Sequence, residues 1–258
     1  MKKLKIFDNN NKVTTVENTY QFLNSDIQRF ETAEDETLTI IDIFNEDCEY
    51  QKELVVQKNG TLNYIKIGSK NIHTNTKYIN SIDENGTLNI TFIEQGSSIS
   101  SIETVLDNKS STFTINGLID LEGNSKVDYN IQTNHLVEST SDISFKNLLD
   151  GNSFAKINIF SKVDKDAAFS KAFQNSKTIL LSDDSAIAVT PHLEISIDEL
   201  EASHGATCGD LDKDSLYYLQ SRGLSKADAK QMLLNAIRND VYEKLENEEL
   251  VTYVKGLL

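Results

Sequence analysis

The chain has 258 residues, of which 38% are hydrophobic and 25% charged, and its formal net charge at pH 7 is -15. This length is sufficient for one elongated domain with a small appendage, or for two modest domains. Phosphate recognition requires a basic surface, so the acidic balance argues against nucleic-acid binding. The two cysteines, Cys48 and Cys208, form no C-x-x-C pair, which is typical of a reducing cytosol rather than of a disulfide scaffold.

The N-terminal residues MKKLKIFDNNNKV include lysines but lack the continuous apolar segment of a secretory signal. No apolar run approaches the roughly 18 residues of a membrane span. We therefore expect a cytoplasmic protein that does not bind membranes. Residues 1–34 are predicted to form an N-terminal segment, in which the stretch from Thr14 to Thr32 has room for at most one helix.

Residues 35–208 are predicted to form a β-domain, because short strand-like runs alternate there with turn residues. The runs are 38–43, 62–67, 88–93, 113–115, 127–131, 143–145, 157–160, 179–181 and 193–197. An N-G-T-L-N sequence occurs at Asn59 and again at Asn85, and Asn-Gly fits the positive-φ positions of a tight turn. Two such copies are compatible with rungs of a β-solenoid and equally with hairpins of a β-sandwich.

The last of these runs has the alternation of a half-buried strand, with apolar Leu193, Ile195 and Ile197 separated by polar residues. Pro191, the one proline of the chain, is expected at the start of this strand. Residues 203–209 (SHGATCG) then predict a loop of small residues, which would let another surface approach its histidine and its thiol.

Residues 209–258 are predicted to form a helical domain. A first helix would place Tyr217 on its apolar face and end at Gly223. Ser225 and Asp228 resemble the capping box of a second, longer helix. Its apolar stripe, and a shorter one over 248–258, fit packing against the rest of the chain and also fit docking to a partner protein.

The order of motifs over residues 180–233 resembles the C-terminal core of the SufB and SufD proteins of iron-sulfur cluster assembly. The shared motifs are an LLSDD run, a P-x-LEI strand, SHGAT, an acidic D-L-D turn, a YYL helix and SRG. Weaker similarity extends back through the segment 143–177 to His135. The resemblance implies a right-handed parallel β-helix with a small C-terminal helical domain, and a chain that lacks most of the helical domain found before the β-helix in long members.

No nucleotide-binding loop, G-x-S-x-G elbow or H-E-x-x-H helix is present in the sequence, so an independent enzyme is not expected. The resemblance implies a non-catalytic subunit of a cytosolic iron-sulfur assembly complex. Its partners would be a SufB-type scaffold and a SufC-type ABC ATPase. No cofactor would be stably bound, and an iron-sulfur cluster would be present only transiently at the subunit interface.

The resemblance also implies roles for individual residues. His204 matches a family histidine at the interface with the paired subunit, where it takes part in cluster assembly. Cys208 would be either a second soft metal ligand or a small buried side chain. Ser185 stands where SufB-type scaffolds carry a cysteine on which the cluster depends, and serine is a weaker iron ligand than thiolate. With His204-Gly205 in place of His-Glu, this points to the SufD type.

Two partner surfaces are expected. The joint with the paired subunit is predicted to be the strand that contains Leu193, Ile195 and Ile197. The ATPase is expected to bind the helical tail, with Tyr217, Tyr218 and Arg222 as anchors.

Two other functions remain open. A minimal homodimeric scaffold would bind the nascent cluster itself, through His204, Cys208 and carboxylates such as Glu199 or Glu201. A solenoid enzyme acting on acidic polysaccharide would need clustered charges along one face, whereas the outward strand positions are mostly Asn, Ser and Thr. For His135, a hydrogen bond that caps a rung is a sufficient explanation.

Overall fold

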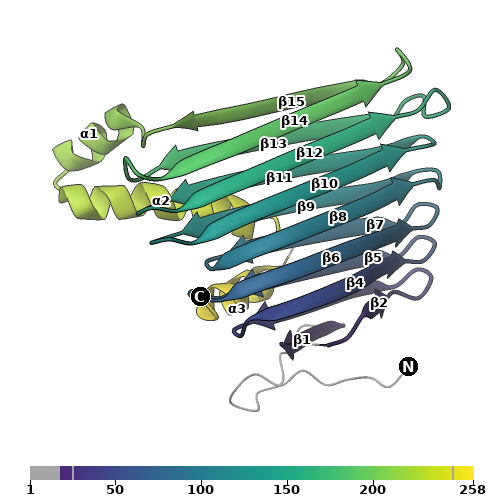
Figure 1. Cartoon of the computed structure of the whole chain (residues 1–258), viewed down its shortest axis with the longest axis horizontal. Coiled ribbons are helices and arrows are strands. Elements are labelled where there is room, and N and C mark those ends of the chain that lie inside the picture. The colour runs from purple at the N-terminus through teal and green to yellow at the C-terminus, as the bar shows by residue number, and fades with distance from the viewer. Residues whose placement is uncertain (1–17, 25, 246) are drawn as a thin grey trace.

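Figure 1 shows the computed structural model of the chain, which describes residues 18–24, 26–245 and 247–258. The chain winds as a parallel β-solenoid, because successive strands alternate between two sheets and each sheet pairs only strands two positions apart. The odd-numbered strands form an eight-stranded sheet and the even-numbered strands a seven-stranded sheet. The predicted mainly β fold with a solenoid core and a small helical part is confirmed.

The strands of the two sheets lie side by side in rungs. The eight-stranded sheet contains β1 (Thr19–Leu23), β3 (Thr37–Phe44), β5 (Thr61–Gly68), β7 (Thr87–Glu94), β9 (Ser111–Leu121), β11 (Ser139–Leu149), β13 (Lys171–Leu180) and β15 (Glu201–Gly209). The seven-stranded sheet contains β2 (Arg29–Glu31), β4 (Cys48–Val56), β6 (His73–Ile82), β8 (Ser97–Leu106), β10 (Lys126–His135), β12 (Phe154–Val163) and β14 (Ala186–Ile195). The helices are α1 (Lys213–Ser221), α2 (Lys226–Tyr242) and α3 (Glu248–Gly256).

The two copies of the N-G-T-L-N sequence occupy equivalent positions in adjacent rungs. Asn59 and Asn85 have φ angles of 55° and 57°, as the turn chemistry predicted. The Asn85 side chain donates from Nδ2 to Oδ1 of Asn59 at 3.0 Å, and Asn89 donates likewise to Asn63 at 2.9 Å. The repeat therefore belongs to a solenoid, and the sandwich alternative is wrong.

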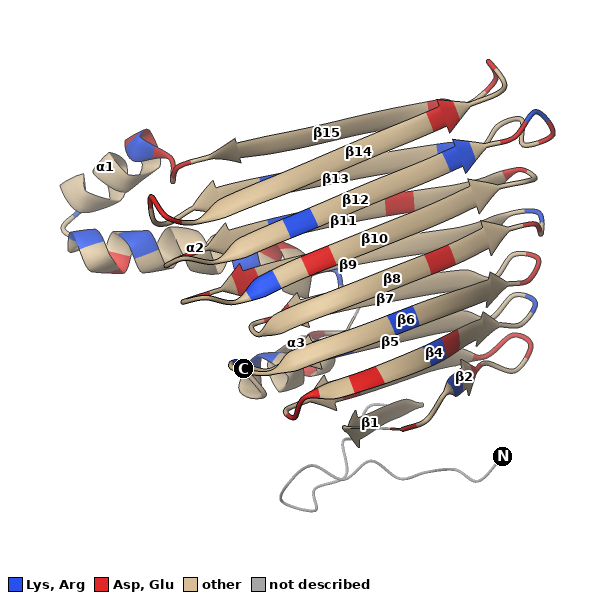
Figure 2. Cartoon of the chain, in the orientation of Figure 1, with Lys and Arg blue, Asp and Glu red and all other residues tan. Residues whose placement is uncertain are grey.

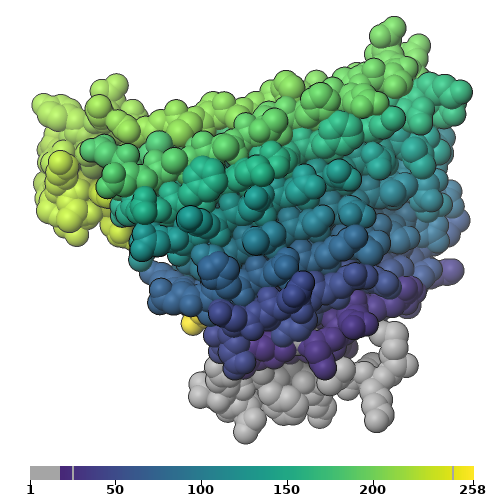
Figure 3. Space-filling model, in the orientation of Figure 1, coloured from purple at the N-terminus to yellow at the C-terminus, as the bar shows by residue number. Residues whose placement is uncertain are grey.

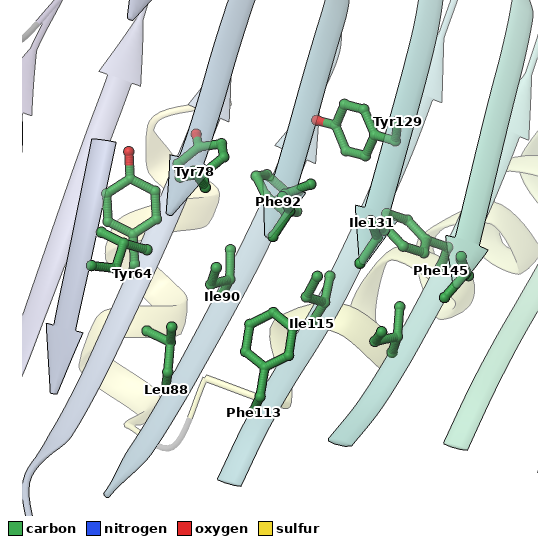
Figure 4. Close-up of a cluster of buried hydrophobic side chains, with 14 of the residues drawn as sticks. Tyr64, Tyr78, Leu88, Ile90, Phe92, Phe113, Ile115, Tyr129, Ile131 and Phe145 are labelled. Carbon is green, nitrogen blue, oxygen red and sulfur yellow. The ribbon is translucent and has the colours of Figure 1, made fainter. Parts of the chain in front are cut away.

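The main core fills the space between the two sheets. Aromatic side chains meet edge to face along the solenoid axis, for example Tyr64 with Tyr78 at a centroid distance of 5.7 Å and Phe92 with Tyr129 at 5.2 Å (Figure 4). This edge-to-face geometry is favourable for pairs of aromatic rings. The inward side chains continue from rung to rung, so the core is as long as the solenoid.

Two ion pairs are buried in this core. Lys52 Nζ lies 3.2 Å from Asp42 Oδ2, and Lys66 Nζ lies 2.7 Å from Glu94 Oε1. A Cβ atom at Gly68 would come within 2.1 Å of the Glu94 carboxylate, so glycine makes the second pair sterically feasible. Burial raises the pKa of Asp42, against the opposing effect of Lys52.

A second core lies between the outer face of the eight-stranded sheet and the helices. Leu234 and Val241 of α2 pack there with Val254 of α3 against sheet residues such as Ile65. Arg238 Nε donates to Asp120 Oδ2 at 2.8 Å and joins α2 to β9. Packing of the helical stripes on the chain itself is thus confirmed for α3 and the C-terminal half of α2. No helix in the described part of the chain is both long and apolar enough to cross a membrane.

Several predicted boundaries were wrong. The solenoid begins before residue 35, because β1 and β2 pair with it. The described residues of 14–32 contain no helix, which is consistent with the expectation of at most one. Residues 203–209 are not a loop but the greater part of β15. The run 193–197 is only the end of β14, and β4, β6 and β8 went unrecognised. In β6 and in β8 three of the five inward positions hold Thr, Ser or Asn, which conceals the hydrophobic alternation.

Candidate functional site at the open end of the solenoid

The last rung of the solenoid has no further rung above it. Among the described residues, strands β14 and β15 are terminal in their sheets, and each is paired along one edge only. Figures 1 and 3 show that the helices stand beside this end and do not cover it. We call the surface formed by β14 and β15 the open end.

The register identifies the side chains that the open end presents. β14 is aligned with β12 and β15 with β13, and aligned residues of parallel strands point to the same face. The residues aligned with the inward residues of the rung below are Ile187, Val189, Pro191, Leu193 and Ile195 on β14, and Ala202, His204, Ala206 and Cys208 on β15. All of them are half-buried or exposed, although their partners in the rung below are buried. The open end is therefore an uncovered cross-section of the core.

The free edge of β14 contains the proline. Ala186 N donates to Ser153 O at 3.1 Å and Ser196 N to Val163 O at 3.0 Å, so the even-numbered amides face β12. The odd-numbered amides of β14 point to the free edge, because the direction alternates along a strand. Pro191 hence lies in the middle of an edge strand rather than at its start, and its missing N–H costs no hydrogen bond in the sheet.

The free edge of β15 has no such interruption. Glu201 N donates to Ser170 O at 3.0 Å, so the even-numbered amides from Ala202 to Cys208 face outward with nothing paired to them in the described chain. An unprotected edge of this kind is a template for pairing with another strand.

His204 lies at the middle of this edge strand, and its backbone neighbour in the rung below is Gln174. Gln174 is only 2% exposed, and its Nε2 donates to Ser161 Oγ at 2.8 Å and to His192 O at 3.1 Å. Its Oε1 has no hydrogen-bond partner. Sequence patterns missed Gln174, because only the register of β13 brings this residue, thirty positions upstream, beneath the histidine.

The proposed ligand pair of His204 and Cys208 does not form. The two residues are four positions apart on a strand, which separates their Cα atoms by about 13 Å. At this distance the two side chains cannot bind one ion. Cys208 is exposed, so the prediction of a small buried side chain is also wrong for the isolated chain. Within the described residues, no group of three or more His, Cys, Asp or Glu side chains could hold a metal ion.

The carboxylates considered for a self-contained scaffold also lie elsewhere. Glu201 is aligned with Lys171 on the outward face and pairs with its Nζ at 3.1 Å. Glu199 belongs to the turn between β14 and β15. Ser185 lies in the turn before β14, where its hydroxyl donates to Ser182 O at 2.8 Å. One chain thus brings none of these groups together around the imidazole.

His135 is a structural residue, as predicted. The ring is fully buried, with Nδ1 2.8 Å from Ser139 Oγ and Nε2 2.8 Å from Ser141 Oγ. Burial lowers the pKa of His135 to about 4. The histidine therefore joins the end of β10 to the start of β11 as a neutral ring.

The predicted ATPase anchors gather on the helical lobe formed by α1 and the first half of α2. Tyr217 and Tyr218 are 75% and 56% exposed, and the Arg222 guanidinium lies 5.3 Å from the Tyr218 ring centroid. A shallow groove of about 450 Å³ runs between the two helices. It is lined by Asp214, Ser215, Tyr218, Leu219, Met232, Leu233 and Ala236. No residue of α1 is buried, so the chain itself leaves this apolar face uncovered.

The outer face of the seven-stranded sheet does not resemble a carbohydrate-enzyme cleft. Its charges pair between rungs, as for Lys77 with Glu103 at 3.3 Å and Lys156 with Asp128 at 3.4 Å. Such pairs between neighbouring strands are typical of a solvated sheet face.

Comparison with known proteins agrees with this architecture. The model of the family described as SUF system FeS cluster assembly, SufBD core domain, matches residues 30–237. Protein ABCI7 of Arabidopsis thaliana chloroplasts is 34% identical over 101 residues, which cover 38% of this chain and 21% of that protein. SufD of Escherichia coli is 36% identical over 75 residues, with 29% and 18% covered. SufD of Bacillus subtilis is 32% identical over 91 residues, with 35% and 21% covered.

The aligned segments thus span about a fifth of the length of these curated relatives. The family model, by contrast, includes β2 to β15 and most of the helical lobe. With the solenoid and its open end, this match assigns the chain to the SufBD core-domain family of SUF iron-sulfur cluster assembly.

Proposed function

We propose that the chain is a SufD-type, non-catalytic subunit that pairs through its open end with a SufB-type chain and binds a SufC-type ATPase through its helical lobe. The observation that carries this proposal is the open end itself. It presents an apolar cross-section of the core together with the unpaired edge of β15. Both features favour a second solenoid, because strand addition would satisfy the free amides and cover the apolar side chains at once.

His204 would then serve at the joint. It is aligned with the inward face of the open end, where a second chain would enclose it, while the described residues contain no group of three or more His, Cys, Asp or Glu that could hold a metal ion. The iron-sulfur cluster is the cargo of this system, so the other ligands to iron or sulfur would come from the paired subunit. Ser185 supports the assignment to the SufD type, because its hydroxyl is a weak ligand that already donates to Ser182.

ATPase binding is supported by the exposed tyrosines of the helical lobe. Tyr and Arg are common anchors of protein interfaces, and Tyr217, Tyr218 and Arg222 are contributed by one short helix and its C-cap. Deletion of the whole tail is not a clean test, because α2 and α3 cover an apolar sheet face. Substitutions on α1 leave that second core intact.

The joint is tested by proline substitution on its free edge. Ala206→Pro removes an outward amide that no described residue uses, so the fold should persist while the complex with the SufB-type chain of the same organism weakens. Ala206→Val keeps the amide and is the matched control. Ile195→Pro probes the free edge of β14 in the same way. Unchanged complexes by sizing chromatography for both proline variants would show that these edges are not the joint.

A further inference from the structure

The turns that precede β3, β5, β7, β9 and β13 share one backbone conformation. Their equivalent residues are Asp35, Asn59, Asn85, Ser110 and Phe169, with φ angles of 56°, 55°, 57°, 60° and 66°. Each donates its amide to a backbone carbonyl in the corresponding turn of the following rung: Lys58, Glu84, Lys109, Glu138 and Glu199 respectively. The residue that follows donates to the carbonyl three positions before it, as Gly60 does to Gln57 and Ser170 to Ala167. The five turns are thus structural equivalents at the same side of the solenoid.

Phe169 does not suit this position. Positive φ is tolerated by Asn, Asp and Gly, whereas a bulky residue there is an outlier. Every other described residue with positive φ is Asn, Asp, Ser or Gly. The equivalent Asn59 also donates from Nδ2 to Oδ1 of Asp35 at 2.9 Å, a contact that phenylalanine cannot reproduce. Phe169 thus combines an unfavourable positive φ with the loss of the side-chain hydrogen bond that the equivalent asparagine makes.

The side chain of Phe169 is mostly in solvent and belongs to none of the hydrophobic clusters of the described residues. It is 69% exposed, although burial is the main source of stabilisation by an aromatic ring. Residues held in unfavourable backbone conformations cluster at binding and functional sites. The position in the solenoid indicates which site.

Phe169 adjoins the open end. Its amide donates to Glu199 O at 2.6 Å, in the turn between β14 and β15. In Figure 1 the two turns lie together at the tip of the last rung, on the side away from α1. Ile195 next to this turn is 45% exposed, and Ile197 and Leu200 are partly buried. The Phe169 backbone therefore borders the turn that carries these apolar residues of the open end.

Acidic residues are found at both ends of the last rung (Figure 2). At the Phe169 tip they are Asp164, Asp166, Asp198 and Glu199, with Lys165 as the basic exception. At the opposite end they are Asp183, Asp184, Asp210 and Asp212, with Lys213 as the basic exception, 3.7 Å from Asp210. Antiparallel pairing of β15 with a second copy would bring the first group against the second. Like charges opposed in this way disfavour self-association, whereas a chain with Lys or Arg at these places would be attracted.

We propose that Phe169 is an aromatic anchor that inserts into an apolar pocket rimmed by basic residues on a paralogous solenoid chain. The acidic ends of the rung direct this pairing away from a second copy of the chain. The inference rests on the proposed function of the open end as the pairing surface.

The test substitutes Phe169→Asn, which restores the residue type of the equivalent turns. Relief of the backbone strain should raise the Tm of the isolated chain by about 2 °C. Affinity for the purified SufB-type chain of the same organism, measured by isothermal titration calorimetry, should fall at least about 30-fold, as for loss of an interface anchor. If Phe169 had a purely structural role, the substitution would lower the Tm and leave the affinity unchanged.

Phe169→Ala removes the ring without relieving the strain, so it should weaken pairing and leave Tm without an increase. Ile99→Thr is the matched control, because Ile99 is 52% exposed on β8, away from the open end, and its loss should not change affinity. Sedimentation of the chain alone should show a monomer at concentrations where the heteromeric complex forms.

The outcomes separate the two proposals. Absence of any complex with the wild-type chain would refute the proposed function. A complex that Phe169→Asn binds as tightly as wild type would refute the anchor and leave the proposed function standing. Self-association of the wild-type chain as tight as the heteromeric pairing would overturn the argument from charge.

Discussion

The buried imidazole of His135 makes the stability of the solenoid depend on pH. Both ring nitrogens lie 2.8 Å from serine hydroxyls, and burial lowers the pKa in the folded chain to about 4 from the usual 6.5 of histidine. The unfolded chain therefore takes up a proton at a higher pH than the folded chain does. Folding stability contributed by the neutral ring is fully present above pH 6.5 and is lost as the pH falls toward 4.

The size of the effect follows from the two pKa values. One pKa unit corresponds to 1.36 kcal/mol, so the loss approaches about 3 kcal/mol at low pH and is about 2 kcal/mol at pH 5. Because the ring is fully buried, solvent screening does not reduce this loss of folding stability. Carboxylates titrate in the same range, so the contribution of His135 has to be taken as a difference between two proteins.

The matched variant is His135→Gln, whose amide can both donate and accept near Ser139 and Ser141 but does not titrate. Urea unfolding at pH 7.5 and at pH 5 yields the free energy of unfolding for each protein. The wild type should lose about 2 kcal/mol more than the variant between these pH values. Equal losses in the two proteins would show that the ring is not held neutral by burial.

Three further predictions concern the core and the partner surfaces. Glu94→Gln leaves the ammonium of Lys66 buried without its carboxylate, and urea unfolding should show a loss of about 3–5 kcal/mol; a loss below about 1 kcal/mol would mean that the pair is not buried in solution. Tyr218→Ala should preserve the Tm and weaken ATPase binding in a pull-down, because Tyr218 is exposed, and full retention of the ATPase would exclude this helix face. His204→Ala should assemble normally yet reduce the iron content and visible absorption of the purified complex, with Cys208→Ala as the neighbouring control on the same strand; undiminished iron in the His204 variant would remove its role at the joint.

Local signals in the sequence determined the turns, the helices and the family. Asn-Gly turns adopt positive φ because short polar or absent side chains tolerate it, and caps such as Asp212 and Ser225 accept the hydrogen bonds that mark the starts of α1 and α2. The ordered motifs from LLSDD to SRG indicated the solenoid and the SufBD family, which periodicity alone left undecided. These features depend on neighbours within a few residues, so they can be predicted from the sequence.

Only the tertiary structure decided what surrounds the site. Strand β15 was taken for a loop because small residues at the open end have no core to fill, so the hydrophobic alternation that announces a strand is absent. The separation of His204 from Cys208, and the position of Gln174 beneath the histidine, follow from strand geometry and register between rungs. Sequence patterns did not single out Phe169, because a bulky residue at a positive-φ position is recognised only by comparison with the equivalent turns. In a parallel solenoid the decisive neighbours are a full rung apart, and the length of each turn sets that register.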